Sequence, residues 1–411
     1  MQKFSRTILS NGLTVLVVPN YNTKMACVCI LYKVGSRDEH PDKTGLAHLF
    51  EHLMFSNCGD KVDFDEIMQN AGGDSNAFTT QDTTQYYNVA SANQLEMMIQ
   101  LEAARMKEFQ IKKNDFNIQK KVVIEEFGEH YLNNPYGMFS HMLMPLAYKN
   151  HPYQWPVIGK NQEQIAAISF QDIQEFYEKY YQPANAILVV SGAVVEEEVL
   201  QLVKNYFEPI QGEPKPNTSF KQEAKQKEKR VLISPGEYPE EAMYIAFPSS
   251  KRDCKDFYTL DFATDILSEG KSSILYSKLR KEKMLFSTVD CYMTSTYDPG
   301  LIIFEGKLNP GISTEVALSA FDEVIEELKK NDISQYTFDK YLNKNESAYI
   351  ASQIGVVSQA LNFSYSEWLG DANLVNTELE RYKSITIDDI HEAYNSYFDL
   401  NSANYLYFTK E

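Results

Sequence analysis

A chain of 411 residues is too long for one hydrophobic core and favours about two domains of roughly 200 residues each. Its 57 acidic and 39 basic residues give a net charge of −18, which argues against a general binder of nucleic acid or anionic membranes and favours cationic peptides as partners. The five cysteines are irregularly spaced and do not predict a disulfide framework.

The N-terminal stretch has no charged segment followed by a long apolar run, and no stretch of the sequence is long and apolar enough to span a bilayer. These features favour a cytoplasmic location, although a leader removed before residue 1 would leave the same pattern. Residues 12–20 and 25–39 are rich in β-branched and aliphatic side chains, so we expect two strands joined by a polar turn. Cys27 and Cys29 share one face of the second strand and are expected to pack as small apolar residues.

Residues 48–52 read His-Leu-Phe-Glu-His and predict a metal-binding helix. At about 3.6 residues per turn, the side chains of His48 and His52 lie on one face, where both can reach one metal ion. Glu51 leans toward the same face, where a carboxylate can take a proton from water held by the metal. This spacing is that of the inverted zinc-hydrolase motif H-x-x-E-H, and Thr44 is the expected N-cap.

A second predicted helix, with the sequence NIQKKVVIEEFGEH, supplies candidates for the third metal ligand. Val123 and Phe127 mark its buried side, and Glu126 lies roughly 60° from Val123 on a helical wheel. An unpaired carboxylate turned inward is costly, so a cation is its natural partner. Glu125 and Glu129 point away from the buried side, and we expect both on a solvated face.

The remaining elements of the first half alternate between strands and helices. Residues 63–73 predict a short helix ended by two glycines, and 93–109 predict a long one. Strands are expected at 75–81, 83–91 and 185–194, and a further helix at 169–181, after a proline-rich loop at 151–159. Strands followed by helices predict an α+β fold with helices packed on a mainly antiparallel sheet.

Residues 211–230 carry two prolines and a run of charges without apolar periodicity, which predicts a linker. It would join an N-terminal zinc-binding domain, 1–210, to a C-terminal domain, 231–411. The helix pattern that begins at Ile168 returns 217 residues later at Ile385, and a strand follows each copy. We therefore expect two tandem homologous α+β domains. The second half lacks H-x-x-E-H and is expected to close over the substrate.

Several longer motifs accompany these elements: GSRDE, GLAHLFEHLMF, GGDSNAFT, KKVVIEEF, HPYQWPVIG and EGKSSILYSKLR. Together they resemble the pitrilysin and insulinase family of zinc peptidases, most closely its short bacterial members and the mitochondrial processing peptidase subunits. The resemblance implies that His48, His52 and Glu126 bind Zn²⁺ and that Glu51 is the catalytic base. It also implies that two chains form a four-domain dimer around an internal chamber.

The resemblance further implies that a substrate peptide adds as an extra β-strand to one strand of the first half. An edge strand offers main-chain hydrogen bonds to any peptide sequence, and side-chain pockets add preference. The alternative is an ordinary internal strand. The residues concerned are Ser75, Asn76, Ala77, Phe78 and Thr79.

Two positions depart from the family's pattern. Gln119 stands seven residues before Glu126, where some relatives carry a supporting Glu, so support for the site must be neutral or come from elsewhere. Arg280 matches a substrate-binding and oxyanion-stabilising Arg, but Ser287 replaces the Tyr that usually follows it. The incomplete pair favours the zinc-bearing subunit of a heterodimer with a zinc-less paralogue. The alternatives are a homodimer in which Ser287 or Tyr292 does this task, and a surface salt bridge for Arg280.

The sequence therefore predicts a zinc metalloendopeptidase that hydrolyses peptides, with a preference for basic ones, or unfolded polypeptides in an enclosed chamber. A rival function is a non-catalytic structural or presenting subunit of a processing-peptidase-like complex, against which the intact motif argues. Hydrolysis of a small non-peptide substrate fits the metal site but not the proposed edge strand.

Overall fold

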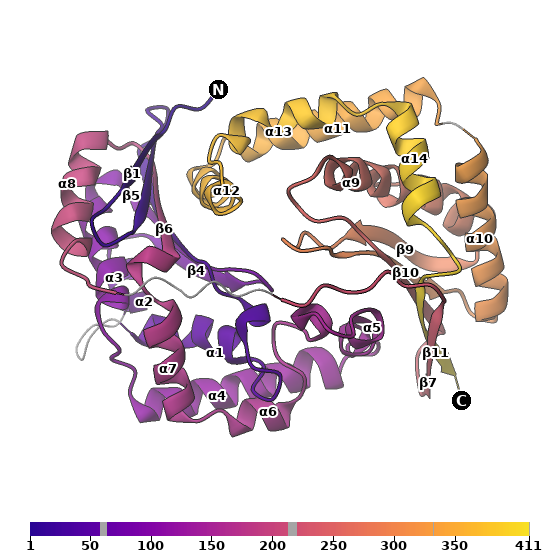
Figure 1. The fold of residues 1–411 in the computed structure, drawn as a ribbon, viewed down its shortest axis with the longest axis horizontal. Helices are drawn as coiled ribbons and strands as arrows, with labels where there is room; N and C mark the ends of the chain where they lie inside the picture. The colour runs from indigo at the N-terminus through magenta and orange to yellow at the C-terminus, as the bar shows by residue number, and fades with distance from the viewer. Residues whose placement is uncertain (58–63, 213–219, 332, 411) are drawn as a thin grey trace. The chain divides into compact units, whose positions relative to one another are not determined.

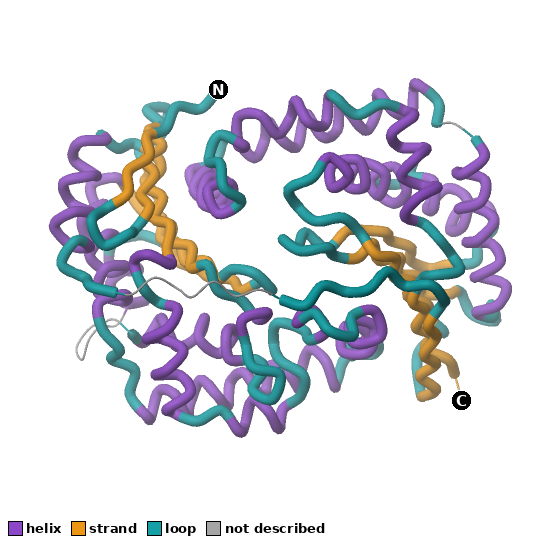
Figure 2. The backbone as a smooth tube through the Cα atoms, viewed as in Figure 1, coloured by secondary structure: helices purple, strands orange, loops and turns teal. Residues whose placement is uncertain are grey.

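The computed structural model describes residues 1–57, 64–212, 220–331 and 333–410 (Figures 1 and 2). The chain divides into two compact units, each built from three separate segments. Unit 1 consists of Met1–Phe127, Trp155–Phe220 and Ile350–Thr377. Unit 2 consists of Gly128–Gln154, Lys221–Tyr349 and Glu378–Glu411. Across the described ranges, no helix combines the length and the apolar composition needed to cross a membrane.

The described residues of unit 1 form a six-stranded sheet of order β1-β2-β6-β3-β5-β4. Its strands are β1 (Ser5–Ile8), β2 (Thr14–Pro19), β3 (Met25–Tyr32), β4 (Asp74–Thr79), β5 (Thr84–Ser91) and β6 (Ala186–Gly192). Neighbouring strands pair antiparallel except β2 and β6, which run parallel. The central strands β3 and β6 are almost entirely buried, which matches their near-continuous apolar sequences.

Helices cover this sheet. Those of unit 1 are α1 (Leu46–Leu53), α2 (Phe64–Asn70), α3 (Leu95–Lys107), α4 (Lys113–Phe127), α6 (Gln162–Ala167), α7 (Phe170–Tyr180), α8 (Glu196–Phe207) and α12 (Val356–Trp368). Helix α12 packs against β2, β3 and β6, and its Ala360 and Phe363 join a buried cluster with side chains of these strands. Cys27 and Cys29 belong to this cluster, which confirms that they pack as small apolar residues.

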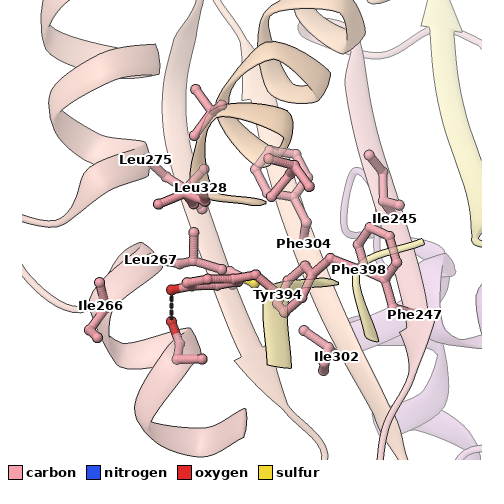
Figure 3. Close-up of a cluster of buried hydrophobic side chains, with 14 of the residues drawn as sticks. Ile245, Phe247, Ile266, Leu267, Leu275, Ile302, Phe304, Leu328, Tyr394 and Phe398 are labelled. Carbon is pink, nitrogen blue, oxygen red and sulfur yellow. Dashed lines mark hydrogen bonds between the residues drawn. The ribbon is translucent and has the colours of Figure 1, made fainter. Parts of the chain in front are cut away.

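The described residues of unit 2 form a five-stranded sheet of order β7-β11-β8-β10-β9. Its strands are β7 (Arg230–Gly236), β8 (Ala242–Pro248), β9 (Phe286–Met293), β10 (Leu301–Leu308) and β11 (Asn404–Lys410). Its helices are α5 (Phe139–Ala147), α9 (Lys255–Ser268), α10 (Thr314–Lys330) and α14 (Ile387–Tyr397). Two further helices, α11 (Gln335–Ser352) and α13 (Leu374–Lys383), each begin in one unit and end in the other. Figure 3 shows part of the core between sheet and helices, where Tyr394 donates a hydrogen bond of 2.9 Å to the carbonyl of Ala263.

The predicted internal repeat is confirmed by the structure. The strand series β2-β6-β3-β5-β4 corresponds to β7-β11-β8-β10-β9, and the first pair in each series is the parallel one. Helices α7 and α14 match residue for residue, and each begins with a capping box, formed by Ser169 and Asp172 in one and by Thr386 and Asp389 in the other. The sequence did not predict β1, because this short strand is only partly buried.

The two packing units are not continuous along the chain. Residues 128–154 pack in unit 2, and residues 350–377 pack in unit 1, so each half of the sequence lends one segment to the unit formed mainly by the other half. The predicted domains, 1–210 and 231–411, are continuous stretches that correspond to the two copies of the repeat, whereas the compact units are not continuous. The predicted domain boundaries stay a prediction.

The predicted linker, 211–230, is described only in part. Residues 213–219 lie outside the described residues. Residues 220–229 contain neither helix nor strand, and β7 begins at Arg230. This agrees with the absence of apolar periodicity in the sequence.

Helix α12 comes from the second half of the sequence but covers one face of the unit 1 sheet. Weakening its packing is therefore expected to destabilise unit 1. Phe363→Ala empties a fully buried site and should lower the free energy of unfolding of unit 1 by about 3–5 kcal/mol. Ile354→Ala, at a side chain that is 72% exposed, is the control and should change it by less than about 0.5 kcal/mol. Urea unfolding followed by fluorescence measures both, and equal small effects would contradict this role of α12.

Candidate metal centre

Helix α1 begins at a glycine that the packing requires. Gly45 has φ +88°, and a Cβ there would lie 2.5 Å from the carbonyl oxygen of Ile158, so any other residue would be strained and crowded. The expectation that Thr44 is the N-cap was wrong. Its hydroxyl instead donates to Oε1 of Gln164 and accepts a hydrogen bond from the backbone N–H of Lys160.

Glu39 accepts hydrogen bonds from backbone N–H groups at the start of α1. The sequence pattern did not predict this role. The oxygens of the Glu39 carboxyl group accept hydrogen bonds from the N–H of Gly45 at 3.0 Å and of Ala47 at 2.7 Å. The side chain is buried, and this burial raises the pKa of Glu39 to about 8 even though both N–H groups act to lower it. The only sequence signal was its place at the end of GSRDE, six residues before the helix.

The apolar side of α1 fixes its rotation. Leu49, Phe50 and Leu53 are fully buried. The ring of Phe50 packs against Phe176, with 5.1 Å between centroids, and against Tyr181, with 4.7 Å. Since these side chains lock one face of the helix inward, the opposite face presents the residues of the H-x-x-E-H motif.

The structure brings His48 and His52 together with Glu126 of the neighbouring helix α4. Nε2 of His48 lies 3.7 Å from one carboxylate oxygen of Glu126, and Nε2 of His52 lies 3.5 Å from the other. One donor atom from each of the three residues lies within 4.8 Å of the other two. Glu125 and Glu129 are exposed, as expected from their positions on the helical wheel.

The surroundings of the two histidines differ. Burial lowers the pKa of His48 to about 4, against the raising effect of Glu126, so this imidazole stays neutral at pH 7. Its Nδ1 is buried without a hydrogen-bond partner in the described part of the chain. Burial also acts to lower the pKa of His52. The hydrogen bond with Glu126 and the negative charge of Glu126 outweigh burial, so the pKa of His52 is raised. A hydrogen bond with Gln119 raises this pKa further. The neutral Gln119 therefore contacts the site at the position where some relatives carry Glu.

Glu51 lies on the same face of α1 and binds a residue of strand β4. Thr79 donates its hydroxyl to Oε2 of Glu51 at 2.7 Å. Burial raises the pKa of Glu51, and this hydrogen bond acts in the opposite direction. Sequence reasoning placed Thr79 on the substrate strand but missed its contact with Glu51, because the two residues are 28 positions apart.

The predicted substrate strand lies within β4, at the edge of the unit 1 sheet. The backbone N–H of Ser75 donates to the side chain of Asp74, and that of Ala77 donates to the side chain of Asn76. These two N–H groups therefore point away from β5, and side chains of the strand itself satisfy them. The side chain of Ala77 is buried, while Phe78 is 36% exposed. The strand's role in substrate binding stays a prediction.

The residues predicted from the second half belong to unit 2. Arg280 is exposed in the π-helical segment Tyr276–Glu282, where its guanidinium lies 5.1 Å from the ring centroid of Tyr276. Ser287 is exposed on β9 and donates to the carbonyl of Lys307. Tyr292 on β9 packs at the margin of a buried cluster, and burial raises its pKa. Their roles toward a substrate stay predictions.

Replacement of Glu39 by Gln tests how α1 is held. A Gln side chain has one acceptor oxygen, so one buried N–H loses its partner, and the protein should lose about 1–3 kcal/mol of stability near pH 5. The wild-type carboxyl has its pKa raised in the folded state, so its contribution is complete below about pH 4.5 and is lost as the pH rises toward about 8. The stability difference measured by urea unfolding should therefore shrink between pH 5 and 8. A difference that grows with pH would mean that the folded carboxylate prefers to be ionised.

Comparison with known proteins agrees with this geometry. The family described as insulinase (peptidase family M16) matches residues 14–161, and the peptidase M16 inactive domain matches residues 167–345. The zinc protease PqqE of Helicobacter pylori is 33% identical over 408 residues, which cover 97% of this chain and 91% of that protein. A probable beta subunit of the mitochondrial-processing peptidase of Arabidopsis thaliana is 26% identical over 210 residues, which cover 51% of this chain and 39% of that protein.

The structural comparison gives the same result. The crystal structure of a protease from Helicobacter pylori matches this chain with a TM-score of 0.94 and 30% sequence identity, and the match covers 100% of both chains. The predicted family resemblance and the α+β fold of two homologous domains are thereby confirmed. The metal-binding motif and the third carboxylate lie in the part matched by the insulinase domain, and the half without the motif is largely matched by the inactive domain. The chain therefore belongs to the M16, or insulinase, family of peptidases.

Proposed function

We propose that this chain is a zinc-dependent endopeptidase that hydrolyses peptides or unfolded polypeptides. The observation that carries the proposal is the convergence of His48, His52 and Glu126, with Glu51 beside them. Two imidazoles and one carboxylate are a donor set of catalytic zinc sites, in which three protein ligands leave one position open. The name of the zinc protease from Helicobacter pylori supports the same metal.

The spacing of the donor atoms fits zinc. Two ligand atoms at about 2.1 Å from a tetrahedral zinc ion are about 3.4 Å apart. The two imidazole nitrogens lie 3.7 and 3.5 Å from the carboxylate oxygens of Glu126. Small side-chain movements are therefore enough for His48, His52 and Glu126 to hold the ion. The low pKa of His48 helps, because only a neutral imidazole has a lone pair to donate.

When bound, zinc supplies a Lewis acid that polarises the scissile carbonyl and lowers the pKa of water toward about 7. Glu51 is the general base of the proposed reaction. Its carboxylate takes the proton from the attacking water and later gives it to the leaving amine. The hydrogen bond from Thr79 restricts the carboxylate to one orientation, and the raised pKa of Glu51 brings it closer to the pKa at which a base can both accept and release a proton.

Strand β4 is the proposed binding site for the substrate backbone. A peptide that adds to this edge can offer its carbonyl groups to the N–H of Ser75 and Ala77, in place of the side chains of Asp74 and Asn76. Since Thr79 ends β4 and contacts Glu51, a peptide on this strand runs toward the proposed base. Main-chain recognition of this kind suits substrates of varied sequence in extended conformation.

We also propose that two chains enclose the substrate in a chamber and that Arg280 binds it. The second chain is either a zinc-less paralogue that supplies Arg and Tyr or another copy, with Ser287 or Tyr292 in place of the Tyr. Assay of the zinc-loaded chain on quenched peptides, alone and with a paralogue, separates the two arrangements. The net charge of −18 favours basic peptides, which digestion of a mixed peptide library would reveal.

A non-catalytic presenting subunit is the second candidate function, and the match of residues 167–345 to an inactive domain is the observation in its favour. The two candidates differ in zinc content and turnover. A presenting subunit needs neither the complete donor set nor Glu51.

Glu51→Gln should leave zinc binding intact and reduce peptide hydrolysis by about two to four orders of magnitude, the usual contribution of a general base. Gln keeps an oxygen that can accept the hydrogen bond from Thr79, so the geometry of the site is preserved. The rate is measured with a quenched peptide at matched zinc content. Substantial activity in this variant would exclude Glu51 as the base.

Glu126→Gln should lower zinc occupancy after gel filtration, whereas Glu125→Gln should not, because the adjacent Glu125 is exposed and outside the group of donors. Loss of an outer contact to a metal typically costs 10- to 100-fold in affinity, and loss of a ligand is expected to cost at least about as much. Elemental analysis of the two purified variants gives the result. Equal zinc loss in both would overturn the assignment of Glu126.

A further inference from the structure

Unit 1 contains a cavity between helix α7 and the loop that precedes α1, and neither the metal-binding residues nor Glu51 line it. Its volume is about 520 Å³, which is within the usual range of small-molecule sites. We call it the α7 pocket. The buried residues of its lining are Glu39, Leu46, Phe176 and Tyr180. Its exposed residues are His40, Pro41, Lys43, Glu175 and Lys179.

Glu39 is the residue of this pocket that points to a ligand. Its side chain is only 7% exposed, and its carboxyl oxygens accept hydrogen bonds from the N–H groups of Gly45 and Ala47. Among the described residues, no basic side chain forms an ion pair with it. With its pKa raised to about 8, the carboxyl group is mostly protonated at pH 7. A cation in the pocket would supply the missing positive charge.

The lysines of the lining do not supply this charge. Lys43 forms an ion pair with Asp172. Nζ of Lys179 lies 4.7 Å from the centroid of the Tyr180 ring. The lining as a whole contains four acidic residues against two lysines and one histidine. A cationic ligand therefore matches the charge of the pocket better than an anion does.

The apolar part of the lining restricts the kind of cation. Leu46 and Phe176 are 7% and 5% exposed, and both line the pocket beside Glu39. A hydrated inorganic ion would leave this apolar surface without a partner. A primary ammonium group on an aliphatic chain uses both parts, because it has three N–H donors for a carboxylate and a carbon chain that can pack on apolar side chains.

The internal repeat offers a comparison within the molecule. Unit 2 has a cavity of about 420 Å³ between α9 and α14, where Lys255 and Asp389 form an ion pair like the one beside the α7 pocket. The buried residues of its lining are Thr259 and Ala393, and Ala393 stands where α7 has Phe176. None of the residues that line it is a buried carboxyl. The ion pair therefore belongs to the repeat, whereas the buried carboxyl and the larger apolar lining are particular to unit 1.

We propose that the α7 pocket binds a primary amine on an aliphatic chain, whose ammonium group pairs with Glu39 and whose carbon chain packs on Leu46 and Phe176. On binding, Glu39 releases its proton to solvent and the ammonium keeps its own, so a neutral carboxyl becomes a paired carboxylate. The ionised oxygens then form stronger hydrogen bonds with the N–H groups of Gly45 and Ala47. An amine in this pocket thereby reinforces the start of α1, the helix that contains both metal-binding histidines. The inference does not depend on zinc or on catalysis.

n-Pentylamine and 1-pentanol are matched probes, because they share the carbon chain and differ in charge at pH 7. Isothermal titration calorimetry of the full chain should show the amine binding about tenfold more tightly or better, since hydrogen bonds between charged groups are the stronger ones. Glu39→Gln should remove this preference. Glu178→Gln should keep it, because Glu178 is exposed on α7 and does not line the pocket. Equal or absent binding of the two probes, or an unchanged preference in Glu39→Gln, would overturn the proposal.

Proton release tests the pairing in the wild-type chain. Calorimetry at pH 7 in two buffers of different ionisation enthalpy should show close to one proton released per amine bound, because a carboxyl with a pKa of about 8 is mostly protonated there. Histidine is the other side chain that titrates near this pH, so His40→Asn is the control and should keep the release. Binding without proton release, or release that disappears in His40→Asn, would contradict the role of Glu39. The other charged groups that face the pocket are Asp38, Lys43, Asp172, Glu175 and Lys179.

Hydrogen exchange tests the effect on α1. Saturation with n-pentylamine should slow exchange of the N–H groups of Gly45 and Ala47 about fivefold or more, because both donate to Glu39. The same concentration of 1-pentanol should not, since it leaves the carboxyl neutral. Unchanged exchange at both positions with the amine bound would overturn the proposed contact.

A lysine side chain carries the same chemical group as a free amine, so N-acetyl-lysine methylamide is the third probe. Binding weaker than that of n-pentylamine would assign the pocket to a free amine. Tighter binding would assign it to a lysine side chain of a peptide. Binding of neither compound would overturn the proposal.

Discussion

The candidate site depends on the fixed orientation of helix α1. Its apolar face is held by aromatic rings of unit 1, and the buried carboxyl group of Glu39 accepts hydrogen bonds from two N–H groups at its start. A helix of eight residues has little stability of its own, so these contacts decide both its position and its rotation. With the apolar face inward, His48 and His52 can only face α4, where Glu126 completes the group of donors. The chemistry proposed for the chain follows from this packing.

The two copies of the duplicated fold differ in the residues that they carry. In unit 1 the region between β3 and β4 contains the motif helix, and the edge strand β4 contacts Glu51 through Thr79. In unit 2 the same strand order is kept without the motif, and the sheet ends in the open apolar strand β7. Because residues 128–154 pack in unit 2 and residues 350–377 pack in unit 1, neither unit is built from one half of the chain alone.

Features encoded by local spacing could be predicted from the sequence, and features made by distant contacts could not. The interval between His48 and His52 and the wheel position of Glu126 depend only on helical geometry, and the structure brings these residues together as expected. The contact between Thr79 and Glu51 and the role of Glu39 depend on the tertiary fold, which no local pattern reports. The same holds for the exchanged segments. Thr44 was assigned as N-cap from a local preference, but its hydroxyl is engaged by Gln164 from a helix more than 100 residues away.

The central claim is that two imidazoles and one carboxylate from two helices bind one zinc ion. Zinc K-edge X-ray absorption of the purified, zinc-loaded chain tests it most directly. Two imidazole nitrogens at about 2.0–2.1 Å are expected, with oxygen as the remaining ligands and no sulfur shell. A sulfur shell at about 2.3 Å, or a spectrum with fewer than two imidazoles, would contradict it.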